Sequence, residues 1–248
     1  MRAFADHFSR VATGYATYRP SYPEGLFAGI AEASPFRDLV WDCATGTGQA
    51  AHGLARHFEL VLASDASARQ VLAASPRPGV RYFVARAEAV PLRSRSVGTI
   101  TVAQALHWLE LPEFYDEARR VLRPGGLLVA WTYGNQRVDG GPVDEVLADF
   151  YHRVVGSYWA PERRWVETGY RTLRFPFHEI PIQSPPMVAE WNLTQLLGYI
   201  GTWSAVVRCR EGTAADPLID LAAGLLPLWG DPSSPRRVEW PISVRAGR

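Results

Sequence analysis

The sequence of 248 residues contains no lysine, so all 26 of its basic side chains are arginines. This absence excludes Schiff-base catalysis, because that chemistry needs a lysine amine. It also leaves no Tyr-x-x-x-Lys pair, a feature that would favour a nicotinamide-dependent dehydrogenase. Abundant arginine together with abundant alanine is typical of a GC-rich genome, so we expect a bacterial source.

Cysteine, net charge and long apolar runs are scarce as well. The two cysteines, Cys43 and Cys209, cannot build a disulfide framework, and no histidine or cysteine spacing indicates a metal site. A net charge of +1 gives no reason to expect a nucleic acid or an anionic membrane as partner. No window approaches the roughly 18 apolar residues of a membrane span, and the N-terminal segment is too charged for a signal peptide. We expect a cytoplasmic protein, either a monomer or a homodimer.

A regular alternation of short apolar strands and helices runs from residue 37 to residue 133. Alternation at this spacing is typical of a parallel sheet that is covered by helices. The predicted strands are Leu39–Cys43, Leu60–Ser64, Val80–Val84, Thr99–Val102 and Leu127–Trp131. The predicted helices are Gln49–Phe58, Ser67–Ala74 and a segment that opens at Pro112 and stops at the "RPGG" of residues 123–126.

The two flanks of this region predict further helices. Residues 1–34 indicate two helices joined by a turn, and apolar stripes at helical spacing cover 143–155, 194–207 and 217–229. The segments "PPMVAEWNLT" and "RVEWPISVR" are predicted to be the last two strands of the same sheet. Seven of the nine tryptophans lie in the second half, which fits either a cap over a small-molecule pocket or a well-filled core.

The first predicted strand ends in "LVWDCATGTG", where Asp42 precedes a glycine-rich turn. Open parallel sheets bind ligands beyond the C-terminal ends of their strands. Gly46 and Gly48 let a ligand approach the backbone without a Cβ in the way. A carboxylate at Asp42 is poorly placed beside a pyrophosphate but suits a ligand that carries an ammonium group.

Four segments together resemble the motifs of class I methyltransferases that use S-adenosylmethionine: "LVWDCATGTG", "LASDAS", "ARAEAVPL" and "RVLRPGGLLV". More narrowly, "YATYRPSYP", "AQALHW" and "TWSAVV" resemble the type 11, trans-aconitate methyltransferase-like branch. The resemblance implies a single α/β domain over residues 1–248, with a Rossmann-like, doubly wound, seven-stranded and mostly parallel sheet and helices on both faces. It divides the chain into an N-terminal lid (1–36), a cofactor-binding core (37–133), and an inserted helical cap with the last strands (134–248).

S-adenosylmethionine carries a sulfonium, an ammonium and a carboxylate, and the resemblance assigns residues to the parts of this cofactor. Asp42 would hold the ammonium, directly or through water. Asp65, at the end of the second strand, would accept both ribose hydroxyls. Ala66 would lie flat against the adenine, and Ala87 would offer its backbone N–H to the adenine edge.

Two positions depart from the pattern of the family. Ala44 stands in the cofactor turn where the motif usually has its first glycine. Arg86 stands where the family often has an aspartate for the adenine amino group. Glu88, two residues later, is predicted to accept that hydrogen bond instead.

The N-terminal segment and the end of the fourth strand supply the remaining candidates. Arg19 would pair with the cofactor carboxylate and Tyr18 would face the sulfonium, unless this segment only anchors a terminal helix. Gln104 and His107 follow the strand whose end faces the transferred methyl, and Gln104 is predicted to contact the cofactor. His107 is the catalytic candidate as a general base, but it could equally orient the substrate or pack against Trp108.

The sequence therefore predicts an S-adenosylmethionine-dependent methyltransferase (EC 2.1.1.-) that acts on a small molecule. Resemblance to acid-methylating enzymes favours O-methylation of a carboxylic acid. The candidates to receive its carboxylate are four late arginines, namely Arg163, Arg164, Arg171 and Arg174. Two alternatives stay open. Gly46, Gly48 and Ala51 also fit the Gly-x-Gly-x-x-Ala of an NAD(P)-dependent Rossmann oxidoreductase, and the same fold could serve as a non-catalytic binding module.

Overall fold

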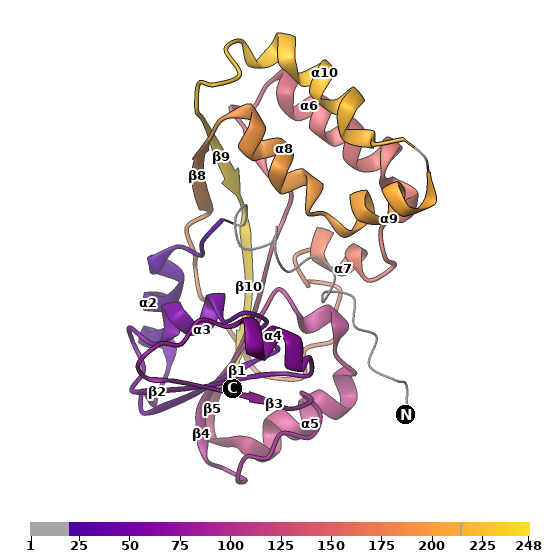
Figure 1. The fold of residues 1–248 in the computed structure, drawn as a ribbon. Coiled ribbons are helices and arrows are strands. Elements are labelled where there is room, and N and C mark those ends of the chain that lie inside the picture. Colours follow the sequence, from indigo (N-terminus) through magenta and orange to yellow (C-terminus); the bar gives the residue numbers. More distant parts are fainter. Residues whose placement is uncertain (1–19, 214) are drawn as a thin grey trace.

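The computed structural model of the protein describes residues 20–213 and 215–248, which form a core and a cap (Figure 1). The predicted lid residues Tyr18 and Arg19 lie outside the described residues. Strand β5 (Leu122–Tyr133) runs from the core toward the cap, and β10 (Ile242–Gly247) returns from the cap to the core. The cap therefore stands beyond the C-terminal end of β5, on the side where a sheet of this kind binds ligands.

The core is built on a seven-stranded sheet with the order β3-β2-β1-β4-β5-β10-β7. Strands β1 to β5 run parallel, whereas β10 is antiparallel to both of its neighbours. The remaining bounds are β1 (Leu39–Cys43), β2 (Leu60–Asp65), β3 (Val80–Val84), β4 (Val97–Ala103) and β7 (Glu179–Ile180). The order reverses between β1 and β4, which is the switch point of a doubly wound sheet. The predicted Rossmann-like α/β fold is confirmed.

Helices cover both faces of this sheet. Their bounds are α2 (Glu24–Ala33), α3 (Gln49–Leu54), α4 (Ala68–Ala73) and α5 (Leu111–Val121). On one face, Phe27 of α2 packs in a cluster with Trp131 of β5. On the other face, Phe114 of α5 meets Trp41 of β1, with ring centroids 6.5 Å apart. Phe114 is fully buried, and its removal from water contributes about 2–3 kcal/mol to holding α5 on the sheet.

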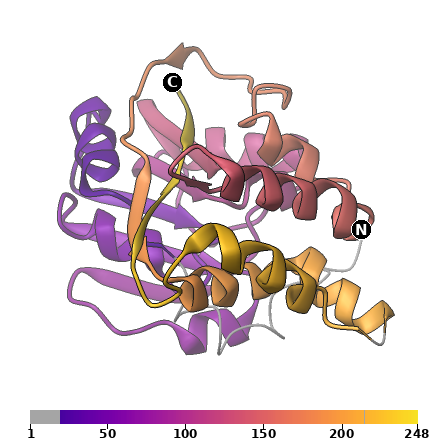
Figure 2. The ribbon, with the colours of Figure 1, turned by 90° about the horizontal axis from the view of Figure 1, so that it is seen from above.

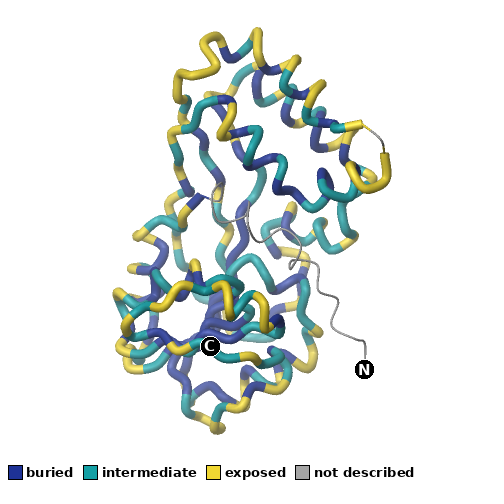
Figure 3. The backbone as a smooth tube through the Cα atoms, in the orientation of Figure 1, coloured by how far each residue is buried: buried dark blue, intermediate teal, exposed yellow. Residues whose placement is uncertain are grey.

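The cap contains a small second sheet of order β6-β9-β8. Its strands are β6 (Arg137–Val138), β8 (Met187–Trp191) and β9 (Arg236–Trp240), and its helices are α6 (Pro142–Asp149), η2 (Phe150–Val154), η3 (Gly156–Tyr158), α7 (Arg163–Glu167), α8 (Leu193–Gly201), α9 (Ser204–Gly212) and α10 (Pro217–Trp229). Helices α6 and α10 run side by side (Figures 1 and 2). Trp203, Trp229 and Trp240 are buried in the apolar core of the cap, which is visible as the dark upper segments of Figure 3. These three tryptophans therefore belong to the hydrophobic core of the cap.

The prediction that "PPMVAEWNLT" and "RVEWPISVR" are the last two strands of the main sheet is wrong. The first segment is β8, which pairs with β9 in the small sheet, with Met187 opposite Trp240. Only the end of the second segment reaches the main sheet, as β10, and β7 supplies the other added strand. Pro241 separates β9 from β10, and proline lacks the N–H that a continuous ladder needs, so the chain changes sheet there.

Three predicted helices have different bounds in the structure. The segment 194–207 contains two helices, α8 and α9, because Thr202 Oγ1 donates to Tyr199 O at 2.7 Å and ends the first of them. The segment 143–155 is α-helical only as far as Asp149 and continues as the π-helix η2. The helix that begins at Gln49 ends at Leu54, four residues earlier than predicted.

Candidate functional site

Asp42 lies at the end of β1 and is fully buried. Thr45 Oγ1 donates to one carboxylate oxygen at 2.5 Å, and Thr101 Oγ1 donates to the other at 2.8 Å. Burial raises the pKa of Asp42 to about 6, although the two threonine hydrogen bonds act in the opposite direction. Asp42 therefore ties the turn after β1 to β4, and its contact with a ligand ammonium would run through water or through Thr45.

The turn after β1 has a left-handed backbone at alternate residues. The φ angle is 55° at Ala44, 58° at Gly46 and 89° at Gly48. A Cβ on Gly46 would meet nothing within 4 Å, so the space beside this glycine is open. A Cβ on Gly48 would collide with Tyr82 Oη of β3, so the packing there, like the left-handed backbone, favours a glycine. Gly46 therefore borders the open space, whereas Gly48 secures the turn against the sheet.

Asp65 ends β2 beside the same turn. Its carboxylate accepts the backbone N–H of Gly46 at 2.8 Å and that of Ser67 at 2.8 Å. Two backbone donors hold the carboxylate in a fixed orientation, as an acceptor for ligand hydroxyls requires. Ala66, the next residue, is half-buried at the position predicted to lie against an adenine. The structure thus brings Gly46, Asp65 and Ala66 together at the carboxyl edge of the sheet.

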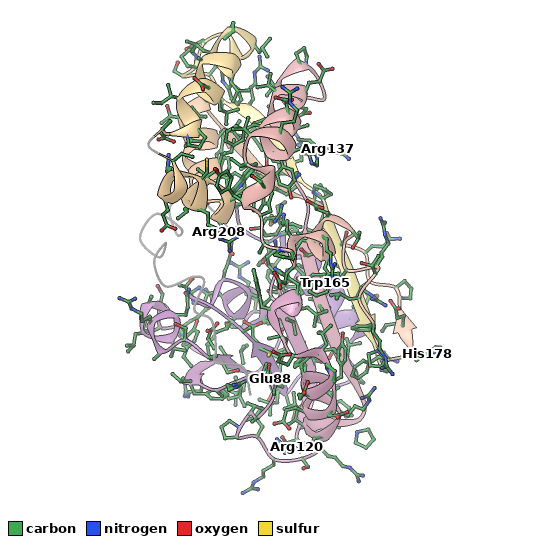
Figure 4. The ribbon with its side chains drawn as sticks, turned by 90° about the vertical axis from the view of Figure 1, so that its right-hand side faces the viewer. Glu88, Arg120, Arg137, Trp165, His178 and Arg208 are labelled. Atoms are coloured by element: carbon green, nitrogen blue, oxygen red, sulfur yellow. The ribbon has the colours of Figure 1, made fainter. Side chains whose placement is uncertain are left out.

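Ala87 and Glu88 follow β3, and Ala87 is buried. The Glu88 carboxylate pairs with Arg86 Nε at 3.3 Å and accepts the backbone N–H of Glu110 at 3.3 Å. Figure 4 shows Glu88 in the core, well below Trp165. An adenine amino group would therefore compete with Arg86 for this carboxylate.

Gln104 follows β4 with a left-handed backbone, φ 53°. Its Oε1 accepts from Thr132 Oγ1 at 2.6 Å and from the backbone N–H of Tyr133 at 2.9 Å. A backbone N–H can only donate, so this contact decides which end of the carboxamide is the oxygen. The Nε2 group carries two N–H donors and forms no hydrogen bond within the described part of the chain. These donors remain available at the carboxyl edge of the sheet.

His107 lies in the short helix η1 (Leu106–Trp108) and is only 8% exposed. Its Nδ1 is 2.8 Å from Tyr170 Oη, and its ring centroid is 4.8 Å from that of Trp108. Burial, and to a smaller degree the positive charge of Arg163, lowers the pKa of His107 to about 3. The imidazole is therefore neutral at pH 7 and a weak base. This environment favours hydrogen bonding or packing over general-base catalysis.

Arg163 begins α7 and joins the cap to the core. Its Nε donates to Tyr151 Oη at 2.7 Å, and its Nη2 donates to Asn135 Oδ1 at 2.8 Å, just beyond β5. The guanidinium also lies 4.6 Å from the ring centroid of Trp159 and 5.4 Å from that of Tyr151. Tyr151 Oη donates in turn to Glu167 Oε1 at 2.7 Å. Apart from Asn135, these residues line a cavity of about 300 Å³.

The other three candidate arginines are exposed. Arg164 lies over the ring of Trp165 at 4.9 Å, where the cap meets the core in Figure 4. Arg171 and Arg174 follow α7 at the surface. Of the four, Arg163 is the half-buried one.

The sequence did not reveal the residues that hold these groups in place, which are Thr45, Tyr82, Thr101, Asn135, Tyr151, Glu167 and Tyr170. Thr45 had a signal, since it lies inside the glycine-rich motif. The partners of Asp42 and His107 had none, because Thr101 and Tyr170 are 59 and 63 residues away along the chain.

Among known protein families, the methyltransferase domain matches residues 41–130, which contain the glycine turn, Asp65 and Gln104. A Dictyostelium discoideum protein with a provisional methyltransferase name is 31% identical over 226 residues, which are 90% of this chain and 86% of that protein. The chain belongs to the methyltransferase family. A methyltransferase of Mycobacterium tuberculosis without assigned activity is 32% identical over 133 residues, and the match spans 54% of its length.

Solved structures of methyltransferases share the fold. A protein from Anaeromyxobacter dehalogenans, provisionally named a type II methyltransferase, superposes with a TM-score of 0.87 at 47% identity, covering 93% of this chain and 98% of that one. A protein from Anabaena variabilis, provisionally named a methyltransferase of an antibiotic pathway, gives 0.53 at 16% identity over 86% of this chain and 95% of its own. The predicted class I, S-adenosylmethionine-dependent methyltransferase fold is confirmed. The narrower trans-aconitate branch stays a prediction.

This family implies S-adenosylmethionine as the cofactor of the methyltransferase, and the described residues fit it. The open space beside Gly46 leaves room for a ligand at the backbone, and the oriented Asp65 carboxylate stands next to it. Within residues 20–213 and 215–248, no group of metal-binding side chains occurs. The same residues contain no helix that is long and apolar enough to span a membrane.

Proposed function

We propose that this methyltransferase transfers the methyl group of S-adenosylmethionine to an oxygen of a small carboxylic acid. The proposal is carried by the open space beside Gly46, which the oriented carboxylate of Asp65 borders at the carboxyl edge of the sheet. Gly46 and Gly48 would hold the methionine part, and Asp65 would accept the ribose hydroxyls. Ala66 and Ala87 would contact the adenine.

The chain would divide this work among its regions. Residues 37–133 would hold the cofactor, and the segment 1–36, which includes Tyr18 and Arg19, would close over it. The cap within 134–248 would receive the acceptor. Such closure excludes water and aligns the two reactants, which is the main contribution a protein makes to a displacement of this kind.

When bound, S-adenosylmethionine supplies a methyl on a positively charged sulfur, so the acceptor oxygen forms the C–O bond while the C–S bond breaks and its electron pair returns to sulfur. With a carboxylate acceptor, the negative charge of the acceptor cancels the charge of the sulfonium. No proton is released, and no general base is needed.

The environment of His107 supports an acceptor of this kind. A carboxylic acid is ionised at neutral pH, whereas a phenol or an amine would have to lose a proton. His107 is poorly suited to take that proton, because its pKa is lowered to about 3 by burial and by Arg163. Gln104 Nε2 and the Arg163 guanidinium instead offer hydrogen-bond donors, which suit an anionic oxygen.

Membership of the methyltransferase family removes the reason to expect a nicotinamide-dependent oxidoreductase.

A transfer assay distinguishes an enzyme from a non-catalytic module that only binds the cofactor. The full chain would be incubated with S-adenosylmethionine carrying an isotopically labelled methyl and with a panel of small carboxylic acids, phenols and amines. Mass spectrometry is expected to find the label in methyl esters. Label in phenol ethers or methylamines alone would contradict the acid acceptor, and cofactor binding without any labelled product would favour the non-catalytic module.

A further inference from the structure

A cavity lies between η2 and α7. Its volume of about 300 Å³ lies at the lower end of the range for ligand pockets. One side is formed by η2, a π-helical segment that contributes Tyr151. π-Helical turns are rare and occur frequently at functional sites. The cavity is therefore a candidate site for the methyl acceptor. Gly46 and Asp65 are assigned to the cofactor and provide no site for the acceptor.

Arg163 is the principal cation of this cavity. Its guanidinium is held by two hydrogen bonds, to Tyr151 and Asn135, and rests against the rings of Trp159 and Tyr151. No aspartate or glutamate in the described part of the chain forms an ion pair with it. Glu167 shares the cavity, but its carboxylate accepts from Tyr151 Oη. Among residues 20–213 and 215–248, Arg163 thus has no direct counter-ion.

The balance of charge in the lining favours an anion. The lining contains two arginines, Arg163 and Arg164, and one carboxylate, that of Glu167. A guanidinium has five N–H donors, and the two hydrogen bonds of Arg163 use two of them. A planar fork that hydrogen bonds and aromatic rings already hold in place matches a carboxylate better than a flexible lysine would.

Arg163 also reaches the residues that follow β5, at the carboxyl edge of the sheet where the proposed transfer would occur. Asn135, which accepts from its Nη2, lies just after β5, and β5 is the neighbour of β4. Helix α7, which Arg163 begins, packs against η1, the segment that carries His107. The positive charge of Arg163 contributes to the lowered pKa of His107. An anion bound at Arg163 would therefore lie at the junction of the cap with the core, on the side of η1.

We infer that Arg163 determines specificity by receiving a carboxylate of the methyl acceptor in the cavity between η2 and α7. This inference rests on the proposed function and adds to it the residue that selects an anionic acceptor. Tyr151 and Asn135 act as positioning residues, since they hold the guanidinium and do not themselves carry the charge that selects the ligand.

Matched pairs of charged and neutral ligands test the inference by binding alone. The full chain, saturated with S-adenosylhomocysteine, is titrated with benzoate against benzamide and with succinate against succinamide. Calorimetry and tryptophan fluorescence report binding, because the ring of Trp159 lies 4.6 Å from the guanidinium carbon. The wild-type protein is expected to prefer at least one acid over its amide by roughly tenfold or more.

Three variants assign that preference to Arg163. Arg163→Gln should lower the affinity for the acid by roughly ten- to a hundredfold and leave the affinity for S-adenosylhomocysteine unchanged. Arg163→Lys keeps the positive charge but not the planar fork, so its affinity for the acid should lie between those of wild type and Arg163→Gln. This variant preserves the test if Arg163→Gln melts at a much lower temperature. Arg171→Gln, an exposed arginine on the same segment, should behave as wild type.

The outcomes separate this inference from the proposed function. Absence of S-adenosylhomocysteine binding in the wild-type protein would overturn the proposed function itself. Normal S-adenosylhomocysteine binding overturns the assignment of Arg163 if no acid binds better than its amide, or if the preference survives in Arg163→Gln. An equal loss in Arg171→Gln would show a general effect of surface charge and would also contradict the assignment.

Discussion

At the scale of single residues, Ala44 carries a backbone cost that a substitution can remove. Its φ of 55° is left-handed, and an L-residue there costs roughly 1–2 kcal/mol. Glycine adopts this conformation freely but loses more freedom when the chain folds. We expect Ala44→Gly to raise the free energy of unfolding by about 1 kcal/mol, as measured by urea denaturation.

The same substitution in a helix serves as the control. Ala223 lies exposed within α10, and Ala223→Gly should lower the free energy of unfolding by about 1 kcal/mol. A loss of stability in Ala44→Gly as well would contradict the cost assigned to Ala44.

The buried carboxylate of Asp42 predicts a dependence of stability on pH. Burial raises its pKa from 3.8 to about 6, so the folded protein holds this proton more tightly than the unfolded chain does. The stabilisation is complete below pH ~4 and is lost as the pH rises through ~6. A shift of about two pKa units corresponds to about 3 kcal/mol. Relative to wild type, Asp42→Asn should therefore gain about 3 kcal/mol of unfolding free energy between pH ~4 and pH ~7.

Urea denaturation of both proteins at several pH values measures this difference. Titrating groups that do not interact with Asp42 contribute equally to both proteins and cancel. Parallel curves of unfolding free energy against pH would show that Asp42 titrates normally in the folded protein.

The sequence can predict the position of a site residue when the end of a strand determines it, but not when a partner distant along the chain does. Asp42, Gly46 and Asp65 could be placed at one edge, because parallel strands end together there. The orientation of Gln104 and the neutral state of His107 could not be predicted. The orientation of Gln104 depends on Thr132, which reaches it only through the pairing of β4 with β5. The neutral state of His107 depends on its burial and on Arg163, and both require the packing of α7 against η1.

At the scale of elements, helix α8 begins with a reciprocal cap. Gln195 N–H donates to Asn192 Oδ1 at 3.0 Å, and Asn192 N–H donates to Gln195 Oε1 at 2.9 Å. Asn192→Ala should destabilise the protein by about 1 kcal/mol and speed hydrogen exchange in α8, because the Gln195 N–H at the helix start loses its acceptor. Asn192→Ser should retain most of the cap. Unchanged exchange in α8 of the alanine variant would mean that packing alone holds this helix.

Element types could be predicted where one period extends over the whole segment, as in β1 to β5 and in α10. The wrong helix bounds and the wrong strand assignment have local causes that do not alter the hydrophobic periodicity. Thr202 ends α8 through its own side chain, and Pro241 moves the chain from the small sheet into the main one. The π-helical turn η2 continues the apolar stripe of α6, so the sequence pattern shows no change at Phe150.

At the scale of the whole molecule, the proposed methyl transfer between core and cap needs no proton acceptor. His107 is held neutral, and a carboxylate acceptor is already ionised. The rate of transfer should therefore stay flat between about pH 6 and 8 in the wild-type protein. His107→Asn should weaken acceptor binding more than it slows transfer. A wild-type rate that rises with a pKa near 6.5, and loses that rise in His107→Asn, would instead identify a general base and a phenol, amine or carbon acceptor.

Binding of S-adenosylmethionine by the turn after β1 and the carboxylate of Asp65 can be measured by titration calorimetry. We predict a single site in the wild-type protein and, in Asp65→Ala, affinity that is weaker by roughly tenfold or more, because a charged hydrogen bond is lost. Asp38→Ala removes an exposed carboxylate that pairs with Arg123, and it should leave the affinity unchanged. Binding of a nicotinamide cofactor without binding of S-adenosylmethionine, or equal affinity in wild type and Asp65→Ala, would contradict this cofactor site.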